Sequence, residues 1–278
     1  MRFTLAIAVL SLLAAAGAPA EPVKNKPQIA LDPAHAYVMY AGAHWGQTLT
    51  IVSIPTSADM EAYRRNRAAA LEQARRDYAQ KQATWQARKP GDTAPPPVEP
   101  TDATFEFRLP IVSVTMGAFP GDRFARTDTR SIYLESLPPG DYYVDGPIFN
   151  GPADGVQATC LCLGTVRFHV SAGQITDLGR IISTFYEAKQ RAKAAGTPPP
   201  RSPLDLPDGV TTMAIEPALP GAPVDPRIGA FPVKPAEYHP FGKFQNTTGE
   251  LVDRLTEMPG VFRYDGDVMI DLTGGGAR

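Results

Sequence analysis

The two cysteines of the chain lie two residues apart, as Cys160-Leu161-Cys162. Exposed thiolates at this spacing could chelate a soft ion such as Cu(I), bridge to a partner or form a strained disulfide. If the next strand begins at Cys160, both cysteines share the parity of Val166 and face the core, whereas His169 points the other way. We therefore favour two small buried cysteines. A copper-handling protein that uses Cys160 and Cys162 is kept as an alternative.

Asp32, His35 and His44 are the residue types of a metal site with two histidines and one carboxylate, and they flank a single apolar run. Such ligands would suit a metal-dependent hydrolase of the cell envelope, which is a further alternative. The chain has no H-E-x-x-H, G-x-S-x-G, P-loop or G-x-G-x-x-G spacing. We therefore expect a protein that is not an enzyme and has no bound cofactor, with these three residues and the two cysteines as the candidates for a metal.

A run without proline or glycine predicts a helix over residues 57–89, which Thr56 or Ser57 could cap. The helix carries eight basic and four acidic residues. It could contact an anionic partner, either an envelope protein or an anionic envelope polymer, although a solvated helix face is the interpretation that we favour. The candidate contacts are Arg64, Arg67 and Arg75.

Tyr142 and Tyr143 are the other candidates for partner binding. With further aromatic residues they could form a platform for a sugar, because an aromatic ring offers a flat apolar face and tyrosine adds a polar group. Core or edge packing is the more common role of tyrosine in a β-sandwich, and that interpretation stays open.

The elements that must position these residues begin after a leader. Arg2 precedes an apolar run from Phe3 to Ala16, and Ala18-Pro19-Ala20 has the small-x-small pattern of a cleavage site. This layout predicts a signal peptide over residues 1–20, and therefore a periplasmic or secreted protein. No later segment approaches the length of a transmembrane helix, so we expect the mature chain not to span a membrane.

Short stretches of alternating or β-branched residues, separated by Gly/Pro turns and without βαβ alternation, predict a mainly β fold. We expect an antiparallel β-sandwich over residues 21–182, interrupted by the 57–89 helix and a Pro-rich connector at 90–100. The expected strands lie at 36–41, 48–54, 105–109, 111–116, 131–135, 142–144, 166–170 and 175–182.

The remainder of the chain is expected to be less regular. Residues 183–240 should form a short helix over 183–195 and then a Pro-rich linker. Residues 241–278 should form a small α/β segment, with a short helix ending near Leu255 and a strand at 261–264. Asp265-Gly266-Asp267 predicts a turn between strands in preference to a calcium loop.

The composition excludes several classes of function. The 278 residues have a net charge of −2, 43% hydrophobic residues and 29 prolines. This gives no general attraction to nucleic acid, and it provides enough apolar residues for a core. We therefore expect no nucleic-acid partner.

Two stretches resemble the carboxypeptidase-regulatory-like, or transthyretin-like, β-sandwich modules of bacterial envelope proteins. Residues 137–144 (LPPGDYYV) are similar to that family's L-x-PG-x-Y-x-V hairpin, and residues 170–179 (VSAGQITDLG) are similar to its closing edge. The resemblance implies a non-catalytic accessory or binding domain and transfers no functional residue. We therefore expect an exported envelope protein that acts as a non-enzymatic binding or assembly module, with a ligand that the sequence does not identify.

Overall fold

The computed structural model describes residues 20–43, 48–88, 93, 95–107, 109, 111–117, 120–151, 155–207, 209–246 and 250–274. Except for Ala20, the expected signal peptide lies outside these residues. The chain divides into two compact units. The sandwich unit comprises Met1–Val52 and Ser113–Arg278, and the insertion comprises Ser53–Val112. The expectation of a mainly β fold with a long inserted helix is confirmed.

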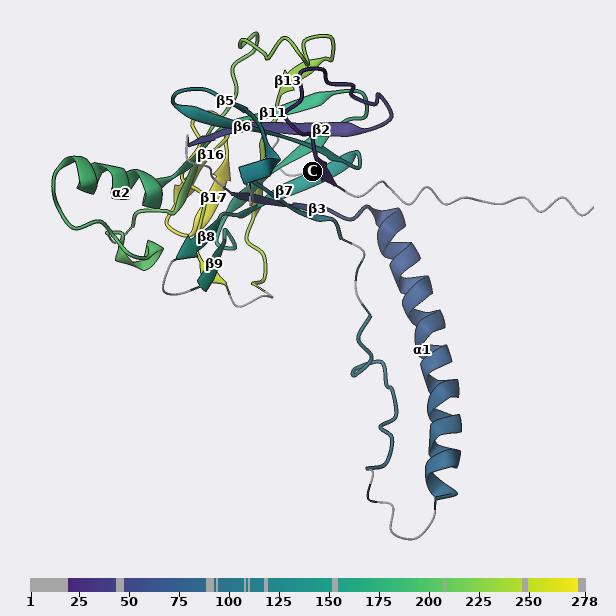
Figure 1. The fold of residues 1–278 in the computed structure, drawn as a ribbon. Coiled ribbons are helices and arrows are strands. Elements are labelled where there is room, and N and C mark those ends of the chain that lie inside the picture. Colours follow the sequence, from purple (N-terminus) through teal and green to yellow (C-terminus); the bar gives the residue numbers. More distant parts are fainter. Residues whose placement is uncertain are drawn as a thin grey trace, which may run out of the picture. The chain divides into compact units, whose positions relative to one another are not determined.

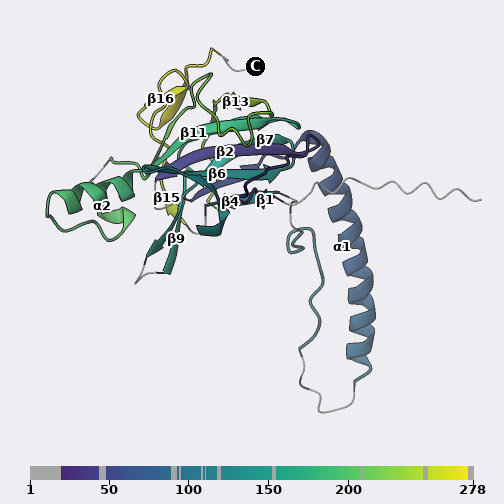
Figure 2. The same cartoon turned by 45° about the horizontal axis from the view of Figure 1, so that its top comes forward.

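The larger sheet of the sandwich unit, sheet A, has seven strands. Its order is β1-β6-β2-β11-β12, with β5 added beside β6 and β13 beside β11. Figure 2 shows β2, β6 and β11 running side by side. The strands are β1 (Glu21–Pro22), β2 (Ala36–Ala43), β5 (Arg123–Arg126), β6 (Arg130–Leu137), β11 (Ile175–Ser183), β12 (Met213–Glu216) and β13 (Val233–Pro235).

The second sheet, sheet B, has five strands in the order β14-β10-β7-β3-β4. Its strands β7 and β3 are labelled in Figure 1. Its strands are β3 (Leu49–Ser53), β4 (Ser113–Met116), β7 (Gly140–Gly146), β10 (Thr165–Val170) and β14 (His239–Gly242). The proline in β14 occupies an edge strand, where a missing N–H costs least.

The inner faces of the two sheets form the main core. Along β2, Ala36, Val38 and Tyr40 alternate with residues of the opposite face and are fully buried. Tyr40 stacks on Tyr133 of β6, with ring centroids 4.9 Å apart. Its hydroxyl donates to the carbonyl of Met116 in β4 at 3.3 Å. One side chain therefore spans from sheet A to sheet B, which identifies the sandwich.

Two Gly-containing turns connect the sheets. Leu137-Pro138-Pro139-Gly140 leads from β6 in sheet A to β7 in sheet B, and Gly173 lies in the turn from β10 to β11. The expectation that the first turn closes a hairpin is therefore wrong, because its two strands pair with different neighbours. The Tyr142 hydroxyl donates to the Pro138 carbonyl at 2.9 Å and fixes this crossing, as tyrosine corners do in other sandwiches.

Sheet A is mixed, whereas the sequence predicts antiparallel strands. β11 runs parallel to β2, with Ile175 opposite Tyr37 and Asp177 opposite Met39, and it is also parallel to β13. Alternating apolar residues mark which face of a strand is buried but carry no information about strand direction.

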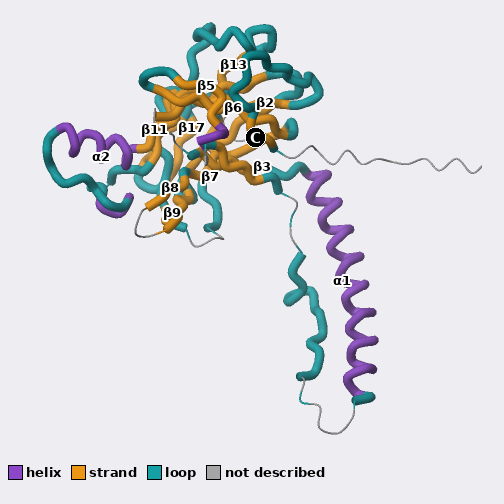
Figure 3. Tube along the Cα trace, viewed as in Figure 1, coloured by secondary structure: helices purple, strands orange, loops and turns teal. Residues whose placement is uncertain are grey.

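The outer face of sheet A carries a second apolar cluster. Its buried members are Tyr37, Phe124, Leu134, Ile175 and Ile228. Partly buried side chains from residues 23–31 and 224–233 pack against the cluster. Figure 3 shows that loops lie over this part of the sheet. We call residues 217–235 the covering segment.

The remaining strands form two small sheets. β8 (Ile148–Gly151), β9 (Gly155–Cys160) and β15 (Leu251–Val252) form one, and β16 (Phe262–Asp265) with β17 (Val268–Asp271) forms the other. The turn at Asp265-Gly266-Asp267 is confirmed. The helix expected before Leu255 is wrong for the described residues of that stretch: residues 251–252 are a strand and 253–255 have no regular structure.

The segment after β11 contributes to both large sheets. It begins with α2 (Thr184–Ala194), capped by Ser183 and followed by Gly196 at φ +69°, which confirms the helix expected there. Beyond it, and after short 3₁₀ turns such as Pro203–Asp205, β12 and β13 extend sheet A and β14 extends sheet B.

The insertion consists of one helix and a returning chain. α1 (Ser57–Gln86) starts with a capping box, in which Thr56 and Asp59 each bond the other's backbone N–H. The strand expected at 105–109 is wrong for its described residues. Phe107 instead packs on Tyr63 of α1, with ring centroids 5.6 Å apart, so the alternation of phenylalanines reflects a helix contact. In the described chain, no helix has both the length and the apolar composition that crossing a bilayer requires.

Candidate functional site

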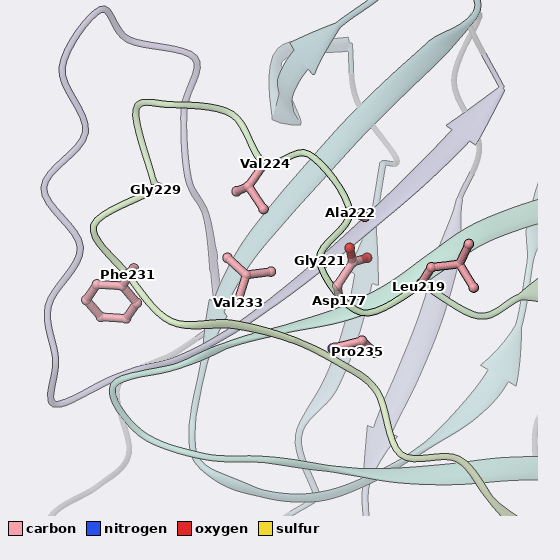
Figure 4. Close-up of a pocket in the computed structure, with 9 residues that line it drawn as sticks. All are labelled: Asp177, Leu219, Gly221, Ala222, Val224, Gly229, Phe231, Val233 and Pro235. Carbon is pink, nitrogen blue, oxygen red and sulfur yellow. The ribbon is translucent and has the colours of Figure 1, made fainter.

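A cavity of about 210 Å³ lies between the outer face of sheet A and the covering segment. Figure 4 shows the Asp177 carboxyl directed from β11 toward the loop at Gly221 and Ala222. We call it the Asp177 cavity. The rest of its wall is apolar side chain or glycine, contributed by Leu219, Val224, Gly229, Phe231, Val233 and Pro235.

A β-bulge in β11 shapes the floor of this cavity. Asp177 lies opposite Met39 and Arg180 lies opposite Ala41, so the extra residue between them places both charged residues on the outer face. Gly179 within the bulge has φ +82°, and a Cβ at this position would lie 2.1 Å from the Glu216 carbonyl oxygen. Only glycine allows β12 and the start of the covering segment to approach so closely.

The middle of the covering segment is anchored by Arg227. Its guanidinium bonds both carboxylate oxygens of Asp225, at 3.0 and 2.7 Å, and lies 4.7 Å from the centroid of the Phe124 ring. It also donates to the Asn25 side chain at 2.7 Å and to the Lys26 carbonyl at 2.9 Å. The wall of the cavity is therefore held to the N-terminal segment before any ligand arrives.

A larger, open cleft adjoins the cavity. This Arg130 cleft has about 390 Å³ and shares Asp177, Leu219 and Ala222 with the cavity. Arg130 and Arg180 line it. Arg180 forms ion pairs with Glu216 at 3.1 Å and with Glu187 at 3.4 Å, so its charge is already compensated.

The electrostatic environment of Asp177 is unusual for an aspartate. Desolvation raises the pKa of its carboxyl, and a hydrogen bond from the Gly179 N–H, 2.8 Å from Oδ1, opposes this only in part. Among the described residues, no lysine, arginine or histidine forms an ion pair with Asp177. Chemically, the site offers a desolvated carboxyl acceptor at the floor of an open pocket, whose wall combines apolar side chains with polar backbone atoms.

The histidine and aspartate candidates for a metal have other contacts. Asp32 accepts from the Ala34 N–H at 2.8 Å and shapes a turn, and His35 Nδ1 lies 3.0 Å from the Ser136 hydroxyl. His44 lies outside the described residues. No cluster of three or more His, Cys, Asp or Glu side chains suited to a metal occurs within the described part of the chain.

Cys160 and Cys162 are buried, as expected, and joined in a disulfide. The strand expected at 166–170 is β10, which begins at Thr165, so the condition that it start at Cys160 is not met. β9 ends at Cys160 and the chain turns, with the Gly164 N–H bonded to the Leu161 carbonyl. The turn brings the two Cα atoms to 5.1 Å, compared with about 6.6 Å for alternate residues of an extended strand.

Two of the three candidate arginines contact the insertion itself. Arg67 donates to the Asp102 carbonyl at 2.6 Å and the Phe105 carbonyl at 3.3 Å. Arg75 pairs with Glu72 at 2.8 Å and with Asp102 at 3.5 Å. These side chains hold the returning chain beside α1, and Figure 1 shows the two backbone segments next to each other within this unit. Arg64 is exposed on α1.

The two candidate tyrosines have different environments. Tyr142 is buried in the core and stacks on Phe168. Tyr143 is half-buried and stacks on Phe241, with centroids 4.8 Å apart, while Phe244 meets its edge at 4.9 Å. Burial raises the pKa of Tyr143 to about 12. Its ring thus already has aromatic partners within the chain.

The sequence analysis did not identify Asp177 as a site residue. One signal was present: Asp177 interrupts the apolar run Ile175–Ile182, and Gly179 follows two residues later, a combination that indicates a bulge. The covering segment carried no signal beyond its prolines. No family model, no curated protein and no solved structure matches the chain.

Proposed function

We propose that this protein is an exported, non-enzymatic binding module that holds a small ligand in the Asp177 cavity. The observation that carries this proposal is the cavity itself, with apolar side chains in its wall, one desolvated carboxyl and a covering segment anchored by Arg227. Small-molecule sites commonly combine an apolar enclosure with a few polar groups that orient the ligand.

The disulfide supports the exported location. Disulfides persist in the periplasm and outside the cell and are rare where thiols are kept reduced, and both cysteines of the chain are bonded to each other. The pattern of residues 1–20 points to the same compartment. A disulfide offers no thiolate to a soft ion, so copper handling by Cys160 and Cys162 would require prior reduction.

A binding role also agrees with the resemblance to transthyretin-like modules. The two stretches that carry the resemblance include both turns that cross between the sheets, and β11, which carries Asp177, begins in the second of them. We propose the module as an accessory domain of the cell envelope on this basis.

Filling the cavity tests the proposal. Ala222 and Ala230 are both exposed alanines of the covering segment, but only Ala222 lines the cavity. We expect a screen of fragments of about ten heavy atoms, followed by saturation-transfer NMR, to give hits that Ala222→Trp abolishes and Ala230→Trp retains. Hits that are equally strong in both variants, or no hits with the wild-type protein, would overturn the proposal.

A separate measurement distinguishes the binding module from the metal-dependent hydrolase. Stoichiometric zinc or copper in the purified protein, lost on His35→Ala, would replace the binding module with a metal site built from Asp32, His35 and His44. Elemental analysis of both proteins decides this without knowledge of the ligand or substrate.

A further inference from the structure

The acids around the covering segment differ in whether a cation compensates their charge. Asp225 is bonded by Arg227 and Glu216 by Arg180. The Asp177 carboxyl, by contrast, accepts a hydrogen bond from a neutral donor, the Gly179 backbone N–H, at 2.8 Å. Asp177 is thus a desolvated acid without an ion-pair partner in the described chain.

The side chains that line the cavity around Asp177 include no cation to compensate the charge of its carboxyl. Leu219, Val233 and Pro235 form the nearby wall, and Gly221 and Ala222 face the carboxyl across the cavity (Figure 4). A desolvated carboxylate in apolar surroundings costs free energy unless a charge or hydrogen-bond donor compensates it. In an otherwise packed domain, such a group in a cavity is a sign of function.

We propose that the Asp177 cavity binds an organic cation, a protonated amine on a compact apolar body, whose ammonium group donates to the Asp177 carboxylate. This inference rests on the proposed binding function and adds the chemical class of the ligand. The ammonium supplies the missing counter-charge, and the apolar body occupies the space between Leu219, Val224 and Val233.

The volume of the cavity limits the size of this ligand. A cavity of about 150 Å³ lined by apolar side chains accommodates benzene, so the 210 Å³ here has room for one ring or a short branched chain with an aminomethyl group. Larger substituents would have to extend into the Arg130 cleft, which opens from the same three shared residues.

A neighbouring cationic side chain could favour a ligand of the opposite charge. Arg130 lines the neighbouring cleft with its backbone bonded to Thr127, and it could attract an anion there. A test of the inference therefore needs a cation, a neutral molecule and an anion of the same shape. Benzylamine, benzyl alcohol and benzoate meet this requirement.

Titration calorimetry of the full mature chain at neutral pH tests the inference. Wild-type protein should bind benzylamine more tightly than benzyl alcohol, and Asp177→Asn should weaken benzylamine binding by about tenfold or more, as expected for a lost charged hydrogen bond. Asp267→Asn is the matched control, because it removes the same charge from an exposed turn elsewhere in the sandwich unit. Neither variant should change the affinity for benzyl alcohol.

The pH dependence gives a readout that needs no variant. Benzylamine requires the ionised carboxylate, so its affinity should fall as the pH drops through the raised pKa of Asp177, whereas that of benzyl alcohol should not. Tight binding of benzyl alcohol or benzoate with no preference for benzylamine would refute the cation while leaving the cavity as the ligand site. If none of the three probes binds, and the fragment screen also gives no hits, the binding function fails as well.

Discussion

Two aspartates at the covered surface of sheet A have opposite environments. In the covering segment, Asp225 receives two hydrogen bonds from the Arg227 guanidinium, which hold the pKa of its carboxyl below the ordinary value. On β11, Asp177 is desolvated without an ion pair among the described residues, and the pKa of its carboxyl is raised. The first acid fastens the covering segment to the fold, whereas the second remains available to a ligand.

This difference separates structural from functional charge within one surface. A paired acid stabilises the native state when it is ionised, whereas a desolvated and unpaired acid destabilises it. Stability measurements on matched variants can therefore distinguish the two roles before any ligand is known.

The largest effect is expected from the floor of the cavity. Gly179→Ala must relieve a 2.1 Å contact between its Cβ and the Glu216 carbonyl at a φ of +82°. It should lower the free energy of unfolding by about 3 to 4 kcal/mol in urea denaturation. Gly196→Ala is the control, because Gly196 has a similar φ of +69° but no atom within 4 Å, and it should cost only about 1 kcal/mol. Equal losses in the two variants would show that the close approach to β12 is unimportant.

A second desolvated acid, Glu135, also makes native stability depend on pH, so it must be replaced before the effects of Asp177 and Asp225 are compared. Glu135 lies opposite Val38, on the inner face of sheet A, and its burial raises the pKa of its carboxyl to about 8, with Asp122 and Glu21 adding to the rise and Lys24 opposing it. Because this folded pKa exceeds the ordinary value, native stability should decrease as the pH rises from about 4.5 to about 8. The difference between the two pKa values corresponds to about 5 kcal/mol, and solvent screening of the incompletely buried carboxyl lowers the expected loss to on the order of 3 kcal/mol.

Glu135→Gln should remove most of this slope, measured by urea denaturation at pH 5 and pH 9. The exposed Glu237→Gln should leave the slope unchanged. A slope that persists in Glu135→Gln would mean that the carboxyl is ionised without penalty in the folded protein.

The next largest change in the free energy of unfolding is expected at Arg227, which anchors the covering segment. Arg227→Gln removes the bonds to Asp225, Asn25 and the Lys26 carbonyl, and it should lower the free energy of unfolding by about 2 kcal/mol. Arg263→Gln changes an exposed arginine of β16 and should have little effect. If Arg227→Gln also leaves the free energy of unfolding unchanged, the covering segment is held by its apolar contacts alone.

The smallest changes in the free energy of unfolding are expected from replacing the two aspartates, and they should differ in direction. At pH 7, Asp225→Asn should lower the free energy of unfolding by about 1 kcal/mol, whereas Asp177→Asn should leave it unchanged or raise it by about as much. The stabilisation from Asp225 is lost as the pH falls through its lowered pKa. The stability of the native state with protonated Asp177 is lost as the pH rises through the raised pKa of Asp177. Denaturation of both variants in the Glu135→Gln background measures this, and two changes of the same sign would contradict it.

The sequence was informative where local chemistry decides structure. The helix start at Thr56, the end of α2 before Gly196 and the turn at Gly266 follow from capping and from φ values that favour glycine. The same residues contain no information about strand partners. Thus the β6–β7 turn looked like a hairpin and the parallel pairing of β2 with β11 was unexpected, because both depend on contacts between distant segments.

The candidate site was less predictable for a related reason. Arg67 and Arg75 attracted notice as a cluster of charge, but the returning chain at Asp102 and Phe105 binds them. Asp177 did not attract notice, because its isolation becomes visible only once the covering segment lies over it. A charged residue is functional or structural according to its partners, and the partners here come from more than 25 residues away in the sequence.

The base of the insertion has a consequence for protein engineering. β3 and β4 are antiparallel neighbours from Leu49 opposite Met116 to Val52 opposite Ser113, and the Ser53 N–H bonds the Val112 carbonyl at 2.8 Å. The chain thus leaves and re-enters the sandwich unit at adjacent backbone positions. Excising Ser53–Val112 and joining the strands by a two-residue Asn-Gly turn would shorten the connecting loop through about five halvings, worth about 3 kcal/mol of closure entropy. The result would be a minimal sandwich that keeps the whole Asp177 cavity.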